Sequence, residues 1–131
     1  TMNASNHPHK HRRGLARLRY AFVYSLQGLL AGVRTSPAFR LELALAGFGF
    51  VLAFLLGRNW LEVVFLLAVL VLVLIVEMLN CGIEAAIDRV GFEIHPLSKL
   101  AKDYGSAAVF LSLVLCAGVW LNLLCVRLVA Y

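Results

Sequence analysis

The chain has 131 residues, of which 62% are hydrophobic and 15% are charged. Soluble domains hold roughly half apolar and a quarter charged residues, so this composition excludes a typical soluble domain. Together with a mean hydropathy of +0.87, it predicts an integral membrane protein. Because a spanning helix needs about 20 apolar residues, the length allows about three or four such helices.

Basic side chains are concentrated at the start of the chain. Residues 1–40 contain seven Lys and Arg side chains and no acidic residue. A basic segment beside apolar segments favours anionic lipid headgroups as its partner, and we expect no binding of nucleic acid. Residues 1–13 are polar and predict a disordered basic tail, followed by a single domain at residues 14–131.

The first predicted element is an amphipathic helix at residues 14–35. Apolar side chains such as Leu15, Leu18 and Phe22 recur there at three- and four-residue steps. A basic amphipathic helix next to spanning segments lies in the membrane interface, so we expect a surface helix. Ser36-Pro37 then indicates a turn or the start of a new helix.

Three apolar segments follow, and each predicts a transmembrane helix. They cover residues 41–57, 61–88 and 103–127. A short polar corner around residues 57–60 separates the first two, and residues 89–102 predict a loop that includes a short helix. The prediction is thus an all-α membrane protein with one surface helix and three spans.

The distribution of Lys and Arg predicts the orientation. The N-terminal part and the 89–102 connection carry most of the basic residues, so both are expected to face the cytoplasm. Three spans then place the C-terminus outside.

An acidic stripe, made of three carboxylic acids and one amide, interrupts the second apolar segment near its end. Glu77, Asn80, Glu84 and Asp88 fall within about 80° of each other at a helical 100° per residue, so they share one face. An ionised side chain at the bilayer centre costs roughly 2.5–3.5 kcal/mol or more. A deep carboxylate such as Glu77 should therefore be paired, protonated or bound to a cation.

The loop beyond the stripe adds further charged groups, among them His95, Lys102 and Asp103. Phosphoryl transfer requires carboxylates that hold a divalent cation, an amide that orients a group and a Lys that neutralises phosphate. A buried Glu can in addition act as a general base. No phosphate-binding loop of the soluble kinases is present. The alternative is a non-catalytic assembly or transport subunit whose acids pair with bases of neighbouring helices.

The same residues resemble the prokaryotic diacylglycerol kinases, a family of small integral membrane enzymes. The similarity covers about residues 15–125, and its motifs are YSLQGL at 24–29, AFRLE at 38–42, EMLNCGIEAAIDR at 77–89, HPLS at 95–98 and AKDYGSAA at 101–108. The resemblance implies an ATP- and Mg²⁺-dependent lipid kinase of the bacterial inner membrane that converts diacylglycerol to phosphatidic acid. It also implies a homotrimeric helical bundle with composite active sites at the cytoplasmic interface.

The resemblance implies a role for individual residues as well. Glu77 would be the catalytic base, with Asn80, Lys102 and Asp103 around the transferred phosphoryl group, and Glu84 would hold the metal. Nucleotide binding would involve Arg17, Tyr24, Glu84, Glu93, His95, Lys102 and Asp103. The lipid substrate would meet Arg17, Ser25, Phe39, Arg40, Glu42, Glu77 and Ser106.

Two features depart from a uniform family pattern. The family usually has a second metal-holding Glu where this chain has Ser36, a neutral and poorer Mg²⁺ ligand. The substrate signals are mixed, because the GSAA sequence at 105–108 resembles the diacylglycerol branch and HPL at 95–97 resembles the undecaprenol kinase branch. We therefore expect diacylglycerol as the substrate, with undecaprenol as the alternative.

Overall fold

A computed structural model describes residues 14–130, which form four α-helices. These are α1 (Leu15–Thr35), α2 (Pro37–Leu56), α3 (Trp60–Val90) and α4 (Pro96–Val129). The basic tail expected at residues 1–13 lies outside the described residues. The all-α class predicted from the sequence is confirmed.

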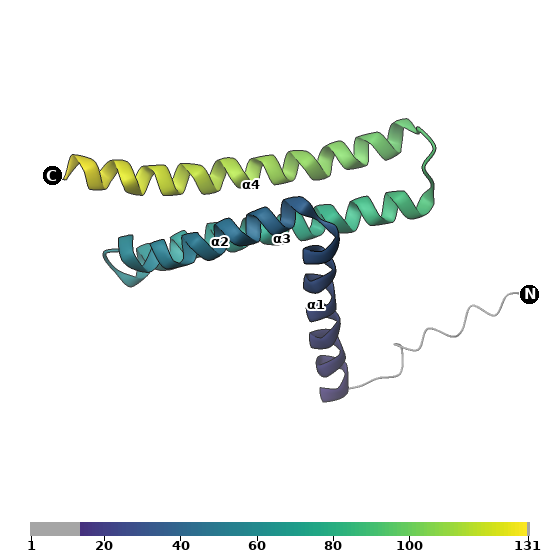
Figure 1. The fold of residues 1–131 in the computed structure, drawn as a ribbon, viewed down its shortest axis with the longest axis horizontal. Coiled ribbons are helices and arrows are strands. Elements are labelled where there is room, and N and C mark those ends of the chain that lie inside the picture. The colour runs from purple at the N-terminus through teal and green to yellow at the C-terminus, as the bar shows by residue number, and fades with distance from the viewer. Residues whose placement is uncertain (1–13, 131) are drawn as a thin grey trace, which may run out of the picture.

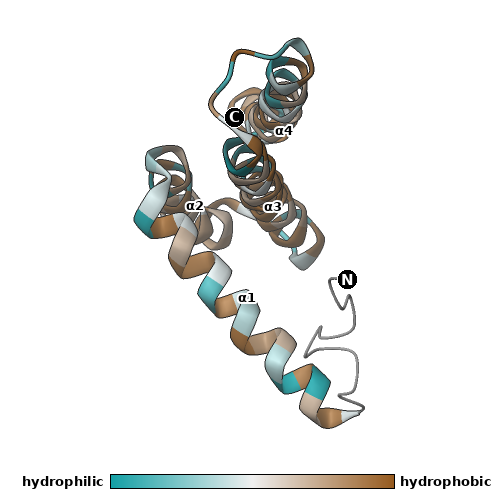
Figure 2. Cartoon of the chain, turned by 90° about the vertical axis from the view of Figure 1, so that its right-hand side faces the viewer, coloured by the Kyte–Doolittle hydropathy of each residue, from teal (hydrophilic) through white to brown (hydrophobic). Residues whose placement is uncertain are grey.

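The helices α2, α3 and α4 run lengthwise beside one another, and α3 packs against both of the others (Figures 1 and 2). Helix α1 projects away from this bundle at the end where α2 begins (Figure 1). The α3–α4 connection lies at the same end of the bundle as α1 (Figure 1). This end therefore brings together the junction of α1 and α2, the last turns of α3 and the first turns of α4.

Helices α2, α3 and α4 are long and apolar enough to cross a membrane. Figure 2 shows them brown over most of their length, whereas polar and apolar residues alternate along α1. Many of their large apolar side chains are exposed, among them Phe48, Phe65 and Phe110. An apolar surface of this extent fits an environment of lipid or of further protein.

Helix α4 begins at Pro96, seven residues before the predicted span at 103–127, so the predicted loop at 89–102 is mostly helical. The connection between α3 and α4 is reduced to residues 91–95. Local capping explains the earlier start. The His95 side chain accepts the Leu97 N–H at 3.1 Å, and Pro96 occupies the first helical position, where its missing N–H has no consequence.

One face of α3 forms most of the core. Its buried apolar residues, Val63, Leu66, Val69 and Val73, follow one another at steps of three or four residues. The same steps continue to Glu77 and Asn80, which are also buried. The helical register therefore directs a carboxyl group and an amide into the face that packs against the neighbouring helices.

Ser36 joins α1 to α2. Its backbone N–H donates to Gly32 O at 2.9 Å and closes α1, while its side chain accepts the Phe39 N–H at 3.1 Å and caps α2. Phe39 is 1% exposed, and a Cβ at Gly32 would lie 3.1 Å from its ring, so the ring packs tightly against α1. An N-cap of this kind stabilises a helix by about 1 kcal/mol.

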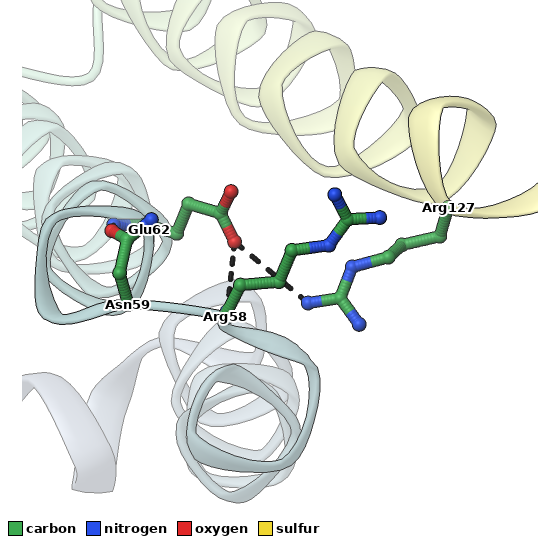
Figure 3. A network of polar contacts seen from close by, with 4 residues as sticks. All are labelled: Arg58, Asn59, Glu62 and Arg127. Carbon is green, nitrogen blue, oxygen red and sulfur yellow. Dashed lines mark hydrogen bonds and ion pairs between the residues drawn. The ribbon is translucent and has the colours of Figure 1, made fainter. Parts of the chain in front are cut away.

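The opposite end of the bundle is held by a polar cluster (Figure 3). Glu62 on α3 accepts the backbone N–H of Arg58 at 2.8 Å and forms an ion pair with Arg127 of α4 at 3.7 Å. The Asn59 side chain accepts the Glu62 N–H at 3.0 Å and caps α3. The cluster thus fixes the α2–α3 corner to the last turns of α4.

We expect Arg127→Ala to lower the free energy of unfolding by about 1 kcal/mol, because it removes a partly buried ion pair between α3 and α4. Arg58→Ala is the matched control, since Glu62 binds the backbone N–H of Arg58. It should change the free energy by less than about 0.5 kcal/mol. Denaturant unfolding in detergent micelles measures both values. Equal losses in the two variants would show that the ion pair is not the stabilising contact.

Candidate active site

A cavity of about 610 Å³ lies between the start of α2, the last third of α3 and the beginning of α4. Its polar lining residues come from these three helices and from the end of α1 at Thr35 and Ser36, although α3 contributes most of them. They are Thr35, Ser36, Glu42, Glu77, Asn80, Cys81, Glu84, Asp88 and Ser106. The acidic stripe of α3 therefore lines the same cavity as Glu42 and Ser106, two residues predicted to contact the lipid.

The acidic stripe shares one face, as its spacing predicted, because all four of its residues line this cavity. The solvent exposure of these side chains increases along the stripe from Glu77 to Asp88. Glu77 is 4% exposed and Asn80 is 9% exposed, whereas Glu84 and Asp88 are accessible. The cavity is thus protected from solvent at Glu77 and open at the carboxylates nearer the end of α3.

Two donors hold the buried carboxylate of Glu77. The Ser36 hydroxyl donates to Glu77 Oε1 at 3.3 Å, and the Cys81 thiol one turn further along α3 donates to the same oxygen at 3.7 Å. A buried carboxylate needs such partners, because burial without hydrogen bonds is costly. The contact with Ser36 also connects α3 to the junction of α1 and α2.

Two buried acceptors have no hydrogen-bond partner among the described residues, namely Asn80 Oδ1 and Glu42 Oε2. Buried polar atoms are normally satisfied, so these two oxygens mark the part of the cavity that suits a ligand with donor groups. A hydroxyl group is one such donor.

Helix α4 approaches α3 closely beside Asn80. A Cβ at Gly105 would overlap Asn80 Oδ1, so a larger residue there would displace the amide. Gly105 is itself buried. The absence of a side chain at this position therefore lets α4 cover the cavity while the amide keeps its place.

A second cavity of about 350 Å³ lies at the α3–α4 connection. It is lined by Glu93, His95, Lys102 and Asp103, which were all predicted to surround the nucleotide. Asp88 lines both cavities and accepts a hydrogen bond from Lys102 at 2.8 Å. The two cavities are therefore neighbours, joined at this carboxylate.

Asp103 has a partner of its own, because Lys99 forms an ion pair with it one turn earlier on α4. Both pairs are largely exposed, with side-chain exposures between 42% and 76%. Exposed ion pairs are weak, so an anionic ligand can replace the carboxylate partner of either lysine at little cost in free energy.

The residues predicted on α1 lie apart from both cavities. Arg17 is in the first turn of α1, about 28 Å along the helix from Ser36 at 1.5 Å per residue. Tyr24 and Ser25 lie near the middle of the helix, and Ser25 borders a shallow apolar depression with Leu18 and Phe22. The described chain does not bring these groups to the acidic stripe.

Two other residues expected to meet the lipid serve the α1–α2 junction. Phe39 is buried there, and the Arg40 side chain donates to Val33 O at 3.0 Å and Arg34 O at 3.3 Å. These carbonyl groups belong to the last turn of α1, where helices leave acceptors without intrahelical partners. Arg40 thus caps α1 in this conformation.

The described residues contain no group of three His, Cys, Asp or Glu side chains arranged to hold a metal ion. Mg²⁺ does not require such a group, since it is commonly held by one or two carboxylates, phosphate oxygens and water. Glu84 lines the cavity as an accessible carboxylate and suits that chemistry. The residues therefore fit a cation that arrives with a phosphate-bearing ligand.

Sequence reasoning missed two features of the site. It expected a turn or the start of a new helix at Ser36-Pro37, in agreement with the cap of α2, but it did not predict the hydrogen bond from the Ser36 hydroxyl to Glu77. It placed Asp88 on the stripe without assigning it a partner. No local signal pairs Asp88 with Lys102, because the two residues lie on different helices.

Comparison with known proteins identifies the family of this chain. Residues 23–124 match the family described as prokaryotic diacylglycerol kinase. The diacylglycerol kinase of Pseudomonas aeruginosa is 46% identical over 117 residues, which cover 89% of this chain and 95% of that protein. Those of Haemophilus influenzae and Escherichia coli K12 are 41% and 40% identical, over 82% and 85% of this chain and 91% of each protein. The chain belongs to the prokaryotic diacylglycerol kinase family.

Proposed function

We propose that this protein transfers the γ-phosphate of ATP to the free hydroxyl of diacylglycerol and so forms phosphatidic acid. Family membership supports a lipid kinase, and the relatives named above are all diacylglycerol kinases. The observation that carries the proposal is the stripe on α3, which leads from the buried Glu77 to the exposed Asp88 beside a second cavity lined by Lys102.

Glu77 is the proposed base. In the reaction, the lipid hydroxyl oxygen forms a bond to the γ-phosphorus, the bond from that phosphorus to the β-γ bridging oxygen breaks, and ADP leaves. The hydroxyl proton goes to the Glu77 carboxylate, which lies in a protected part of the cavity where water competes poorly. Glu42 and Ser106, which line the same cavity, would orient the lipid end.

The nucleotide would occupy the second cavity. Glu93 and His95 line its wall, and Lys102 and Asp103 lie on the first turns of α4. Lys102 would exchange Asp88 for a phosphate oxygen, because its present ion pair is exposed and weak. Asn80, which lines the larger cavity, would donate its amide N–H to the transferred phosphoryl group.

Glu84, an accessible carboxylate of the larger cavity, would hold Mg²⁺ together with the phosphate oxygens of ATP. The cation supplies charge neutralisation for the phosphates when it is bound. Ser36 lacks the charge of a carboxylate, so Glu84 would be the main protein ligand in this chain.

The arrangement in the membrane is also part of the proposal. The concentration of basic residues at the start of the chain supports an orientation in which α1 and both cavities would lie at the cytoplasmic face of a bacterial inner membrane. The family resemblance implies a homotrimer, in which α1 would lie on the surface and bring Arg17 and Tyr24 to the site of a neighbouring subunit. The distance of these two residues from the stripe supports a site completed by another subunit.

A direct assay tests the activity. Purified protein in mixed micelles receives Mg²⁺ and ATP labelled in the γ-phosphate, with diacylglycerol or undecaprenol in parallel samples. Label should enter the organic phase with diacylglycerol. Transfer to undecaprenol alone would overturn the lipid assignment, and transfer to neither alcohol would overturn the kinase proposal.

We expect Glu77→Gln to lower kcat for lipid phosphorylation roughly 100- to 10,000-fold, because the amide cannot accept the hydroxyl proton. Glu62→Gln is the matched control at the opposite end of the bundle, and its kcat should stay within a few-fold of the unsubstituted protein. Initial-rate kinetics at saturating lipid and ATP measure both. A kcat for Glu77→Gln equal to that of Glu62→Gln would exclude the base role.

Glu84→Gln should raise the Mg²⁺ concentration needed for half-maximal activity by about tenfold, because a neutral amide is a weaker ligand for a hard cation. Titration of Mg²⁺ at fixed ATP gives this value. Glu62→Gln is the comparison, since Glu62 lies at the opposite end of the bundle, and its requirement for Mg²⁺ should stay unchanged. An unchanged requirement for Mg²⁺ in Glu84→Gln would remove Glu84 as the metal ligand.

A further inference from the structure

We propose that Ser36 is a positioning residue for Glu77, and that its hydroxyl selects which carboxylate oxygen takes the proton of the lipid. This inference rests on the proposed function, because it concerns the proposed base of that reaction. It gives Ser36 a specific role at the position where the sequence resemblance suggested only the loss of a metal ligand.

The first support is the rigidity of Ser36 itself. Its N–H donates to Gly32 O at 2.9 Å, and its carbonyl oxygen accepts the Arg40 N–H at 3.1 Å. Its side-chain oxygen accepts the Phe39 N–H at 3.1 Å, and Ser36 as a whole is 9% exposed. Three hydrogen bonds to the ends of two helices therefore fix both the backbone and the hydroxyl oxygen.

The second support is the direction of the remaining hydrogen bond. A serine hydroxyl has a single proton to donate, and here the acceptor is Glu77 Oε1 at 3.3 Å. Glu77 lies 41 residues further along the chain, so the contact joins the α1–α2 junction to the buried end of the acidic stripe. A donor fixed in this way restricts the carboxylate to a narrow range of orientations.

The third support is that both donors bind the same oxygen. The Cys81 thiol also donates to Oε1, at 3.7 Å. Oε1 is therefore the oxygen already engaged by the protein, and Oε2 is the oxygen left to accept the proton of the lipid hydroxyl. Misplacement of a base by about 1 Å can reduce a rate 100-fold, so the orientation that Ser36 imposes has direct consequences for turnover.

A purely structural role as the cap of α2 makes a different prediction, and the chain offers a matched control. Asn59 caps α3 through its side chain at 3.0 Å, as Ser36 caps α2, but it lies at the opposite end of the bundle. Ser36→Ala and Asn59→Ala each remove one cap. Only Ser36→Ala also removes a donor from Glu77.

Ser36→Gly and Ser36→Thr complete the set. Glycine is nearly as good an N-cap as serine, so Ser36→Gly removes the hydroxyl with little loss of helix stability. This variant replaces Ser36→Ala in the assay if Ser36→Ala folds poorly. Threonine keeps both the hydroxyl and the cap. All four variants are assayed as full-length protein in micelles with Mg²⁺, ATP and diacylglycerol.

We expect Ser36→Ala and Ser36→Gly to lower kcat about tenfold relative to Asn59→Ala, with KM for ATP within about twofold. Ser36→Thr should restore kcat to within about twofold of the unsubstituted protein. Equal kcat values in Ser36→Ala, Ser36→Gly and Asn59→Ala would overturn the positioning role. Failure of the unsubstituted protein to phosphorylate lipid would instead refute the proposed function.

A spectroscopic readout tests the contact independently of turnover. The chain has five glutamates, so carboxyl-labelled ¹³C-glutamate gives a simple spectrum in which the Glu77 resonance is identified by its loss in Glu77→Gln. This resonance should move in Ser36→Ala and Ser36→Gly and stay in place in Asn59→Ala. An unmoved Glu77 resonance in both Ser36 variants would show that the hydroxyl does not act on this carboxylate.

Discussion

The burial of Glu77 in an otherwise apolar helix face is the constraint on which the site depends. The face that carries Val69 and Val73 continues directly to this carboxyl group, which is 4% exposed. A buried carboxylate needs hydrogen-bond donors, and the main donor is Ser36 at the junction of α1 and α2. The end of α1, the start of α2 and the middle of α3 must therefore meet at one place. That meeting forms the larger cavity and sets where α1 leaves the bundle.

The stripe beyond Glu77 connects two environments. Its buried end lies in the larger cavity, and its exposed end at Asp88 is shared with the cavity at the α3–α4 connection. A lipid kinase must bring an apolar alcohol to a highly charged nucleotide, and a face that changes from buried to exposed within three helical turns suits both substrates. Lys102 lies at the boundary and is held by a weak, exposed ion pair.

Periodicity and composition were sufficient to predict the helical class, the three apolar helices and the common face of the stripe, because these depend on neighbours along one helix. The charges and the histidine before residue 103 suggested a loop with a short helix. In the structure this helical part is the start of α4, for which His95-Pro96 provides a local cap. The bond from Ser36 to Glu77 and the pair of Lys102 with Asp88 could not be predicted. Both depend on how separate helices pack. The resemblance suggested lipid contacts for Phe39 and Arg40, which the structure places in the α1–α2 junction.

The most direct test of the account is a structure of the protein with a non-hydrolysable ATP analogue, Mg²⁺ and diacylglycerol. The account predicts the lipid hydroxyl within hydrogen-bond distance of Glu77 Oε2, the γ-phosphate beside Lys102 and the cation on Glu84. Binding of the nucleotide away from Lys102 and Glu84, for example at Arg58 and Arg127 on the opposite end of the bundle, would contradict it.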